Sequence, residues 1–145
     1  MIAINKTGCL PITRLEHYCK FKVNFKSEVY CDVINIKKYR SALSRFRCSN
    51  HNLAIESGRH QNIPKEDRVC IYCLHVKSKS VIEDEYHFIC ICKLYDDLRC
   101  KYLSNVPLNN YYNFIQIMGT KNSEILKQLS CFIYNAFQLR KVHLT

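Results

Sequence analysis

Four side chains in the middle of the chain have the types and the spacing of a metal site. Cys70 and Cys73 form a Cys-x2-Cys pair, a spacing that lets two thiolates bind one ion from a tight turn. Thirteen residues separate this pair from His87, and four more separate His87 from Cys92. Three sulfurs and one imidazole nitrogen complete a tetrahedron. We therefore expect one structural zinc ion, with no open position for a substrate.

The residues alone leave two alternatives open at this site. If His87 lies in a regular α-helix, Cys90 at i+3 shares its face better than Cys92 at i+5. Zinc modules also use four-residue spacings across a helix end, which favours Cys92. A redox role for the Cys-x2-Cys pair is the other alternative. Metal binding is favoured over it because the surrounding sequence lacks a thioredoxin-like pattern of strand and helix.

The composition favours helices. The chain has 145 residues, which is enough for one domain that buries its own core. Apolar residues make up 48% of it, including seven Phe and ten Tyr, so it is not a disordered segment. Only three Gly and three Pro are present, too few for the many tight turns of a sandwich or a barrel. We expect a mainly α fold.

Ten cysteines raise the question of compartment. In a secreted protein they would suggest a disulfide scaffold. At the N-terminus, however, Asn5, Lys6 and Thr7 interrupt the apolar opening before a signal-peptide core forms. No apolar run approaches the ~20 residues needed to cross a bilayer. We expect an intracellular protein, in the nucleus or the cytoplasm, with reduced cysteines and no membrane partner.

Helices are predicted on both sides of the metal-binding segment. We expect one domain over residues 1–145, with N-terminal helices in 12–48, a zinc-binding core in 49–104 and C-terminal helices in 105–145. The core is expected to be a small zinc knuckle, a short β-ribbon or loop, between helices. Individual helices are predicted at residues 12–25, 28–47, 86–103, 112–119 and from Asn122 or Ser123 onward, and a short strand is predicted at residues 69–73.

Two of these helices have clear apolar faces. In residues 36–47 the apolar side chains fall on one arc, and Lys, Arg and Ser occupy the remainder. The last helix carries a stripe that should be core or a packing seam. Its members are Leu126, Leu129, Phe132, Ile133, Ala136, Phe137 and Arg140.

The charge balance suggests an anionic partner. Lys and Arg number 22 against 12 Asp and Glu, which gives a net charge of +10. Such an excess suits nucleic acid or an anionic surface, although it can also serve solubility alone. Contacts to phosphates would fall off with salt and show little sequence preference. The candidate contacts for RNA or DNA are Lys37, Lys38, Arg40, Arg45, Arg47, Arg59 and Arg68.

A longer pattern surrounds the proposed ligands. It includes Arg40-Ser-Ala-Leu-Ser-Arg-Phe-Arg47, Arg68-Val-Cys70-Ile-Tyr-Cys73, Glu83-Asp-Glu-Tyr86-His87-Phe88, Cys92-Lys-Leu-Tyr95 and Leu98-Arg99. Over roughly residues 35–104 the chain resembles the zinc-binding segment near the C-terminus of reverse-transcriptase polyproteins of non-LTR retrotransposons. The resemblance implies Cys70, Cys73, His87 and Cys92 as the ligands, and so selects Cys92 over Cys90. One departure is Lys93, where the family often has proline.

The resemblance implies a non-catalytic module that follows a polymerase domain and helps to hold template RNA or target DNA. Tyr95-Asp96-Asp97 lacks the intervening residue of the polymerase Tyr-x-Asp-Asp box, and no endonuclease constellation is present. We therefore expect no enzymatic activity and no small-molecule substrate. The alternative is a structural or protein-interaction zinc domain, a remnant of a mobile-element protein. Its partner would be an upstream polymerase domain or a second copy of the chain.

Overall fold

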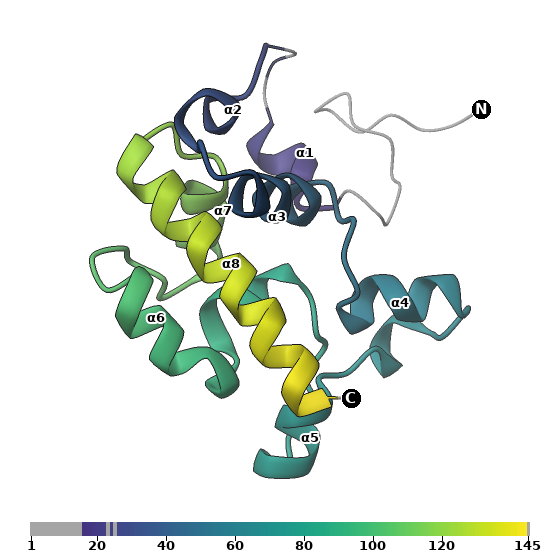
Figure 1. The fold of residues 1–145 in the computed structure, drawn as a ribbon. Coiled ribbons are helices and arrows are strands. Elements are labelled where there is room, and N and C mark those ends of the chain that lie inside the picture. The colour runs from purple at the N-terminus through teal and green to yellow at the C-terminus, as the bar shows by residue number, and fades with distance from the viewer. Residues whose placement is uncertain (1–15, 23, 25, 145) are drawn as a thin grey trace, which may run out of the picture.

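Helices make up most of the structure, a computed structural model that describes residues 16–22, 24 and 26–144 (Figure 1). The mainly α fold predicted from the sequence is confirmed. The α-helices are α1 (Tyr18–Phe21), α2 (Val29–Val33), α3 (Lys37–Arg47), α4 (Ala54–His60), α5 (Ile71–Lys77), α6 (Asp96–Tyr102), α7 (Tyr111–Met118) and α8 (Ser123–Leu144). Tighter or wider turns form η2 (Lys65–Asp67), η3 (His87–Ile91) and η4 (Lys93–Tyr95).

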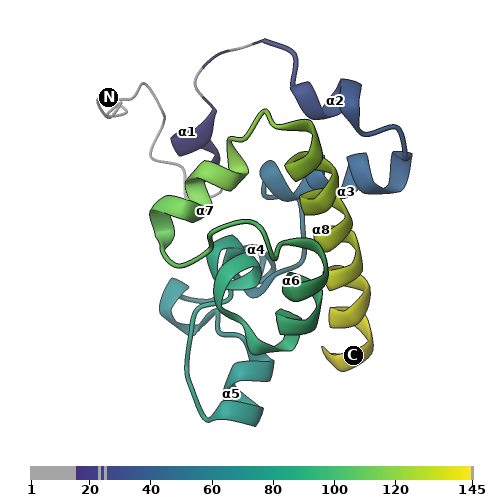
Figure 2. The same cartoon turned by 90° about the vertical axis from the view of Figure 1, so that its left-hand side faces the viewer.

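Helix α8 is the element against which much of the molecule packs. Helices α2, α3, α5 and α6 all contact it, and Figures 1 and 2 show it running along the molecule from the α2 end to the α5 end. Its predicted apolar stripe is core, as expected: Leu126, Leu129, Phe132, Ile133 and Ala136 are buried. Within the described residues, no helix combines the length and apolar character that a bilayer-spanning segment requires.

A cluster of aromatic rings joins α3, η3, η4 and α8. Phe88 is fully buried at its centre, with ring centroids 4.6 Å from Phe137 and 4.7 Å from Tyr95. Phe46 and Phe132 complete its surroundings at 5.4 and 6.0 Å. Aromatic rings at these separations add edge-to-face and offset contacts to the burial of apolar area. The cluster therefore ties the segment that carries His87 to two helices distant in sequence.

The predicted helix at residues 28–47 is two helices. Helix α2 ends at Val33, and Ile34 and Ile36 adopt extended backbone angles before α3 begins. The Arg40 guanidinium donates a hydrogen bond to the carbonyl oxygen of Ile34 at 2.8 Å, which satisfies a backbone group released by this break. Of the predicted helix at 12–25, the described part forms α1. The remaining positions, 12–15, 23 and 25, lie outside the described residues, as does the opening segment 1–10.

Two predictions around the ligands were wrong in detail. In place of a strand at residues 69–73 there is a single antiparallel bridge between Val69 and Ile82, and α5 begins at Ile71. The predicted helix at 86–103 is divided by Cys92, whose backbone is extended between η3 and η4. Both departures occur where the chain positions a cysteine, so tertiary contacts outweigh local propensity there.

Replacing Phe88 by Ala should lower the free energy of unfolding by about 3–5 kcal/mol, because it removes a fully buried ring and leaves a cavity. Urea denaturation followed by circular dichroism measures this change. Tyr112 on α7 is 69% exposed, so Tyr112→Ala is the matched control and should stay within about 0.5 kcal/mol of the parent. Equal losses in the two variants would contradict the central position of Phe88.

Candidate metal centre

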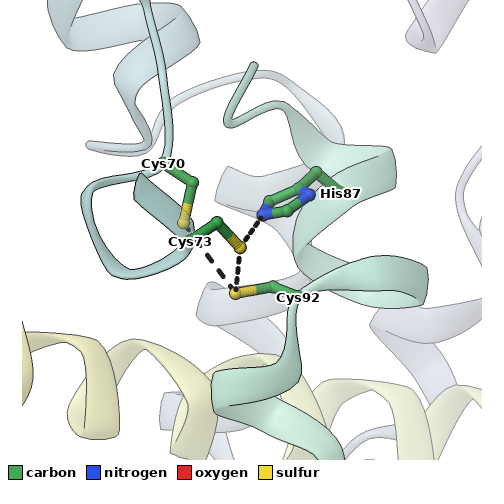
Figure 3. Close-up of side chains that lie close together, drawn as sticks. All are labelled: Cys70, Cys73, His87 and Cys92. Atoms are coloured by element: carbon green, nitrogen blue, oxygen red, sulfur yellow. Dashed lines mark hydrogen bonds between the residues drawn. The ribbon is translucent and has the colours of Figure 1, made fainter. Parts of the chain in front are cut away.

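The four predicted ligands converge in one buried cluster (Figure 3). All four side chains are buried, and their donor atoms lie within 4.8 Å of one another. Sγ of Cys92 is 3.8 Å from Sγ of Cys70 and 3.8 Å from Sγ of Cys73. Nε2 of His87 is 3.4 Å from Sγ of Cys73. The arrangement can hold a metal ion.

Three of the six donor–donor separations match those of a tetrahedral site. With metal–sulfur bonds of about 2.3 Å and metal–nitrogen bonds of about 2.0–2.1 Å, tetrahedral angles place two sulfurs about 3.8 Å apart. The same angles place sulfur and nitrogen about 3.5 Å apart. The measured distances of 3.8 and 3.4 Å agree with both values. The residues present therefore fit an ion at the centre of the cluster.

A short loop presents the first two ligands. Cys70 precedes α5 with an extended backbone, and Cys73 lies in the first turn of that helix. The Cys70 carbonyl accepts from the Leu74 N–H at 3.0 Å, which closes this turn and directs both sulfurs to one side. At the base of the loop, the Cys70 N–H donates to the Val81 carbonyl at 2.8 Å. In place of the predicted β-ribbon there is a single β-bridge, between Val69 and Ile82, and α5 lies in the loop that this bridge closes.

A widened helical turn explains how the last two ligands meet. The Cys92 N–H donates to the His87 carbonyl at 2.8 Å, which is the i→i+5 bond of a π-helix. In an α-helix the residue at i+4 would donate this bond, so the widened turn brings Cys92, five positions on, back to His87. Cys90 lies outside the cluster. Cys92, the ligand that the resemblance implies, is thus the cysteine that lies close enough to the other three donors to share an ion with them.

Arg99 on α6 stabilises the end of this widened turn. Its Nε donates to the Ile89 carbonyl at 2.7 Å, and its Nη2 donates to the Cys92 carbonyl. Its Nη1 is 2.5 Å from Oδ1 of Asp96. A helix end leaves carbonyl groups without partners, and one guanidinium here satisfies two of them. Arg99 therefore positions Cys92 without touching the ligand atoms, a role that sequence reasoning missed.

Glu83 connects the cysteine loop to α4 and α8. Arg140 donates to its two carboxylate oxygens at 2.9 and 2.8 Å, and the Ala54 N–H donates to one of them at 2.7 Å. Glu83 is only 2% exposed, and a buried carboxylate is costly unless it is paired and hydrogen-bonded, as it is here. Glu85 is buried as well, and the partly buried Asp84 between them accepts from the His87 N–H at 2.8 Å, as a residue at a helix start does.

The three thiols differ in proton affinity. Hydrogen bonding from Cys92 lowers the pKa of Cys70 to about 3, and neighbouring His87 adds to this effect. The same contact with Cys70 raises the pKa of Cys92, as does burial. Burial and the charge of Cys70 raise the pKa of Cys73. Three buried sulfurs cannot all ionise in mutual contact, so a bound cation is what would allow all three to act as thiolates.

Three of the seven predicted nucleic-acid contacts face solvent. Lys37, Lys38 and Arg45 are exposed on α3 and form no ion pair within the described part of the chain. The eleven residues of α3 include no Asp or Glu. This helix therefore presents an uncompensated positive surface, which we call the α3 basic surface.

The other four arginines are engaged inside the protein. Arg47 is 5% exposed, with its guanidinium 4.9 Å from the Phe21 ring centroid and 3.3 Å from a Glu28 oxygen. Arg40 caps α2 as described above. Arg59 pairs with Glu56 at 3.0 Å, and Arg68 donates to the carbonyls of Ile55 and Ile63 at 3.1 and 2.9 Å. We omit Arg47 from any interface because its charge is inaccessible.

Searches of protein-family models, of curated proteins and of solved structures each returned no match to this chain.

Cys92→Ser and Cys90→Ser form a matched pair that tests the ligand set. We expect Cys90→Ser to bind Co²⁺ as the parent does, because Cys90 is outside the cluster. Cys92→Ser should lose one thiolate, weaken binding sharply and lower the melting temperature, since ion binding is coupled to folding. Thiolate-to-cobalt absorption during a Co²⁺ titration measures the first effect. The reverse order of the two variants would contradict the assignment.

Arg99→Gln should lower metal affinity by about 10-fold or more, because the Cys92 carbonyl loses its charged donor and keeps the Tyr95 N–H, and the Ile89 carbonyl loses its side-chain donor. Competition with a chelator of known affinity measures the loss. Lys101→Gln on the same helix is the control, since Lys101 is exposed, lies over the Tyr102 ring and forms no ion pair with any residue that the structure describes. Unchanged metal affinity in Arg99→Gln would show that Arg99 does not position Cys92.

Proposed function

We propose that this chain is a non-catalytic nucleic-acid-binding module stabilised by one zinc ion. Three cysteine sulfurs and one imidazole form a donor set that zinc prefers, which supports zinc over harder cations. Four protein ligands fill a tetrahedron and leave no position for water or substrate. The ion would therefore stabilise the fold without supplying chemistry.

The α3 basic surface is the observation that carries the nucleic-acid part of the proposal. The four other predicted contacts are paired with carboxylates or bound to carbonyls, whereas Lys37, Lys38 and Arg45 lie together on one helix and form no ion pair in the described part of the chain. The net charge of +10 adds long-range attraction for a polyanion. Phosphate groups of RNA and of DNA are equally suitable partners for this surface.

The proposal includes the kind of protein. The sequence pattern described above and the convergence of its four ligands support a module like the one that follows the polymerase domain in retrotransposon reverse-transcriptase polyproteins. Such a module would hold RNA or DNA for a catalytic domain elsewhere. It would act in the nucleus or the cytoplasm, where thiols stay reduced and available for zinc.

A second candidate function, protein interaction, is favoured by an apolar patch at one end of the molecule. Ile71, Leu74 and Val76 on α5 and Ile91 at the end of η3 are 40–57% exposed. Figures 1 and 2 show α5 projecting away from most of the helices. An exposed apolar surface of this kind suits a protein partner such as an upstream polymerase domain or a second copy. The stripe of α8, by contrast, is already used in the core.

The test is a titration with fluorescent single-stranded RNA at several salt concentrations. We expect log affinity to fall linearly with log salt. The triple change Lys37→Ala, Lys38→Ala and Arg45→Ala should weaken binding and reduce the slope by about one for each phosphate contact removed.

Three exposed lysines elsewhere provide the control, because Lys77→Ala, Lys79→Ala and Lys121→Ala remove the same charge. This control should bind nearly as the parent does. Equal losses in both triples would show that net charge alone sets the affinity. No binding at low salt would overturn the nucleic-acid function and leave protein interaction.

A further inference from the structure

A groove of about 470 Å³ lies between α3, the turn that follows it and α8. Its volume falls within the range of roughly 300–1,000 Å³ typical of ligand sites. Cations from α3 stand beside it, an aromatic floor lies between the helices, and side-chain amides come from the turn and α8. The residues used below are Lys38, Arg45, Asn50, Asn52, Tyr134 and Gln138.

The charge of the groove suits an anion. Lys38 and Arg45 both line it, both are exposed, and no Asp or Glu is among the lining residues. The two cations are seven positions apart on the helix, which is about 10 Å along the axis. Two cations at this separation would contact different phosphates of a strand and leave room between them for one nucleotide unit.

The polar groups of the groove are free to bind a base. Asn50, Asn52 and Gln138 are exposed, and their side-chain amides make no hydrogen bond within the described residues. Each amide offers both donors and an acceptor, the complement of a base edge. Three such groups around one groove provide polar recognition that the charge of α3 alone does not.

Aromatic rings provide a surface for stacking. Tyr134 is half-buried and meets Tyr39 edge to face, with centroids 5.4 Å apart, and Lys38 Nζ lies 5.0 Å from the Tyr134 centroid. Beneath it, His51 is fixed by a 2.8 Å contact with Glu85 and packs 6.2 Å from Phe137. His51 and Phe137 line the same groove as Tyr134, so three rings contribute to its lining. Stacking on such rings accepts any base.

We infer that this groove binds one unpaired base of a single-stranded nucleic acid. The base stacks against Tyr134 and pairs with the amides, and Lys38 and Arg45 contact the flanking phosphates. A base inside a duplex is stacked and paired, so it cannot enter. This inference rests on the proposed function and deepens it, because it specifies single strands as the ligand and assigns the recognition of a base to the α3–α8 groove.

The experiment compares a short single-stranded RNA with an abasic strand of equal length, which keeps the phosphates and lacks the bases. The parent should bind the strand with bases about 10-fold more tightly. Tyr134→Ala should bring the two affinities together without changing the salt slope, and Tyr134→Phe should retain the preference. Gln138→Ala, at an exposed position, should reduce the preference without affecting the fold. Tyr112→Ala is the control for an exposed tyrosine outside the groove.

The outcomes separate this inference from the proposed function. No binding of either strand at low salt would overturn both. Equal, salt-dependent binding of the two strands by the parent would overturn only the inference that the groove binds a base. The α3 basic surface would remain as a phosphate contact. A preference for the strand with bases that persists in a folded Tyr134→Ala variant would also overturn the inference that the groove binds a base.

Discussion

The contact between three buried thiols and one imidazole is the constraint on which the centre of the structure depends. The segments that carry these groups contain little regular structure: one β-bridge, a short helix, a π-helical turn and a 3-10 turn. Burial and mutual contact raise the pKa of Cys73 and of Cys92, so bringing the sulfurs together is unfavourable for their ionised forms. A divalent cation bound at this cluster would reverse this balance, because it would convert the repulsion of thiolates into ligation.

The basic residues divide into two groups with different physical roles. Arg140, Arg99 and Arg68 are bound to a carboxylate or to carbonyls, and they hold the cysteine loop and the widened turn against α4, α6 and α8. These guanidinium groups are therefore hydrogen-bonded within the fold and are not available to a partner. The unpaired cations of α3 border a groove that also has aromatic and amide groups. Recognition of a nucleic acid would therefore depend on cations that form no ion pair within the described part of the fold.

Much of this arrangement follows from the sequence, and the exceptions have physical causes. Helical periodicity identified α8 and α3, and ligand spacing together with the family resemblance identified the four residues of the cluster. The π-helical turn was missed because it depends on tertiary partners such as Arg99, although the five-residue step from His87 to Cys92 already matches an i→i+5 bond. Arg47 looked like a surface cation because its partner Glu28 and its neighbouring ring of Phe21 come from other elements. The groove was missed for the same reason, since its two sides are distant in sequence.

Elemental analysis of the purified, folded chain tests the central claim most directly. The account predicts one zinc per chain, and predicts that removing it with a strong chelator lowers both the helical signal and the melting temperature. A folded sample that contains no bound metal, and whose melting temperature does not change with added zinc or chelator, would contradict the account.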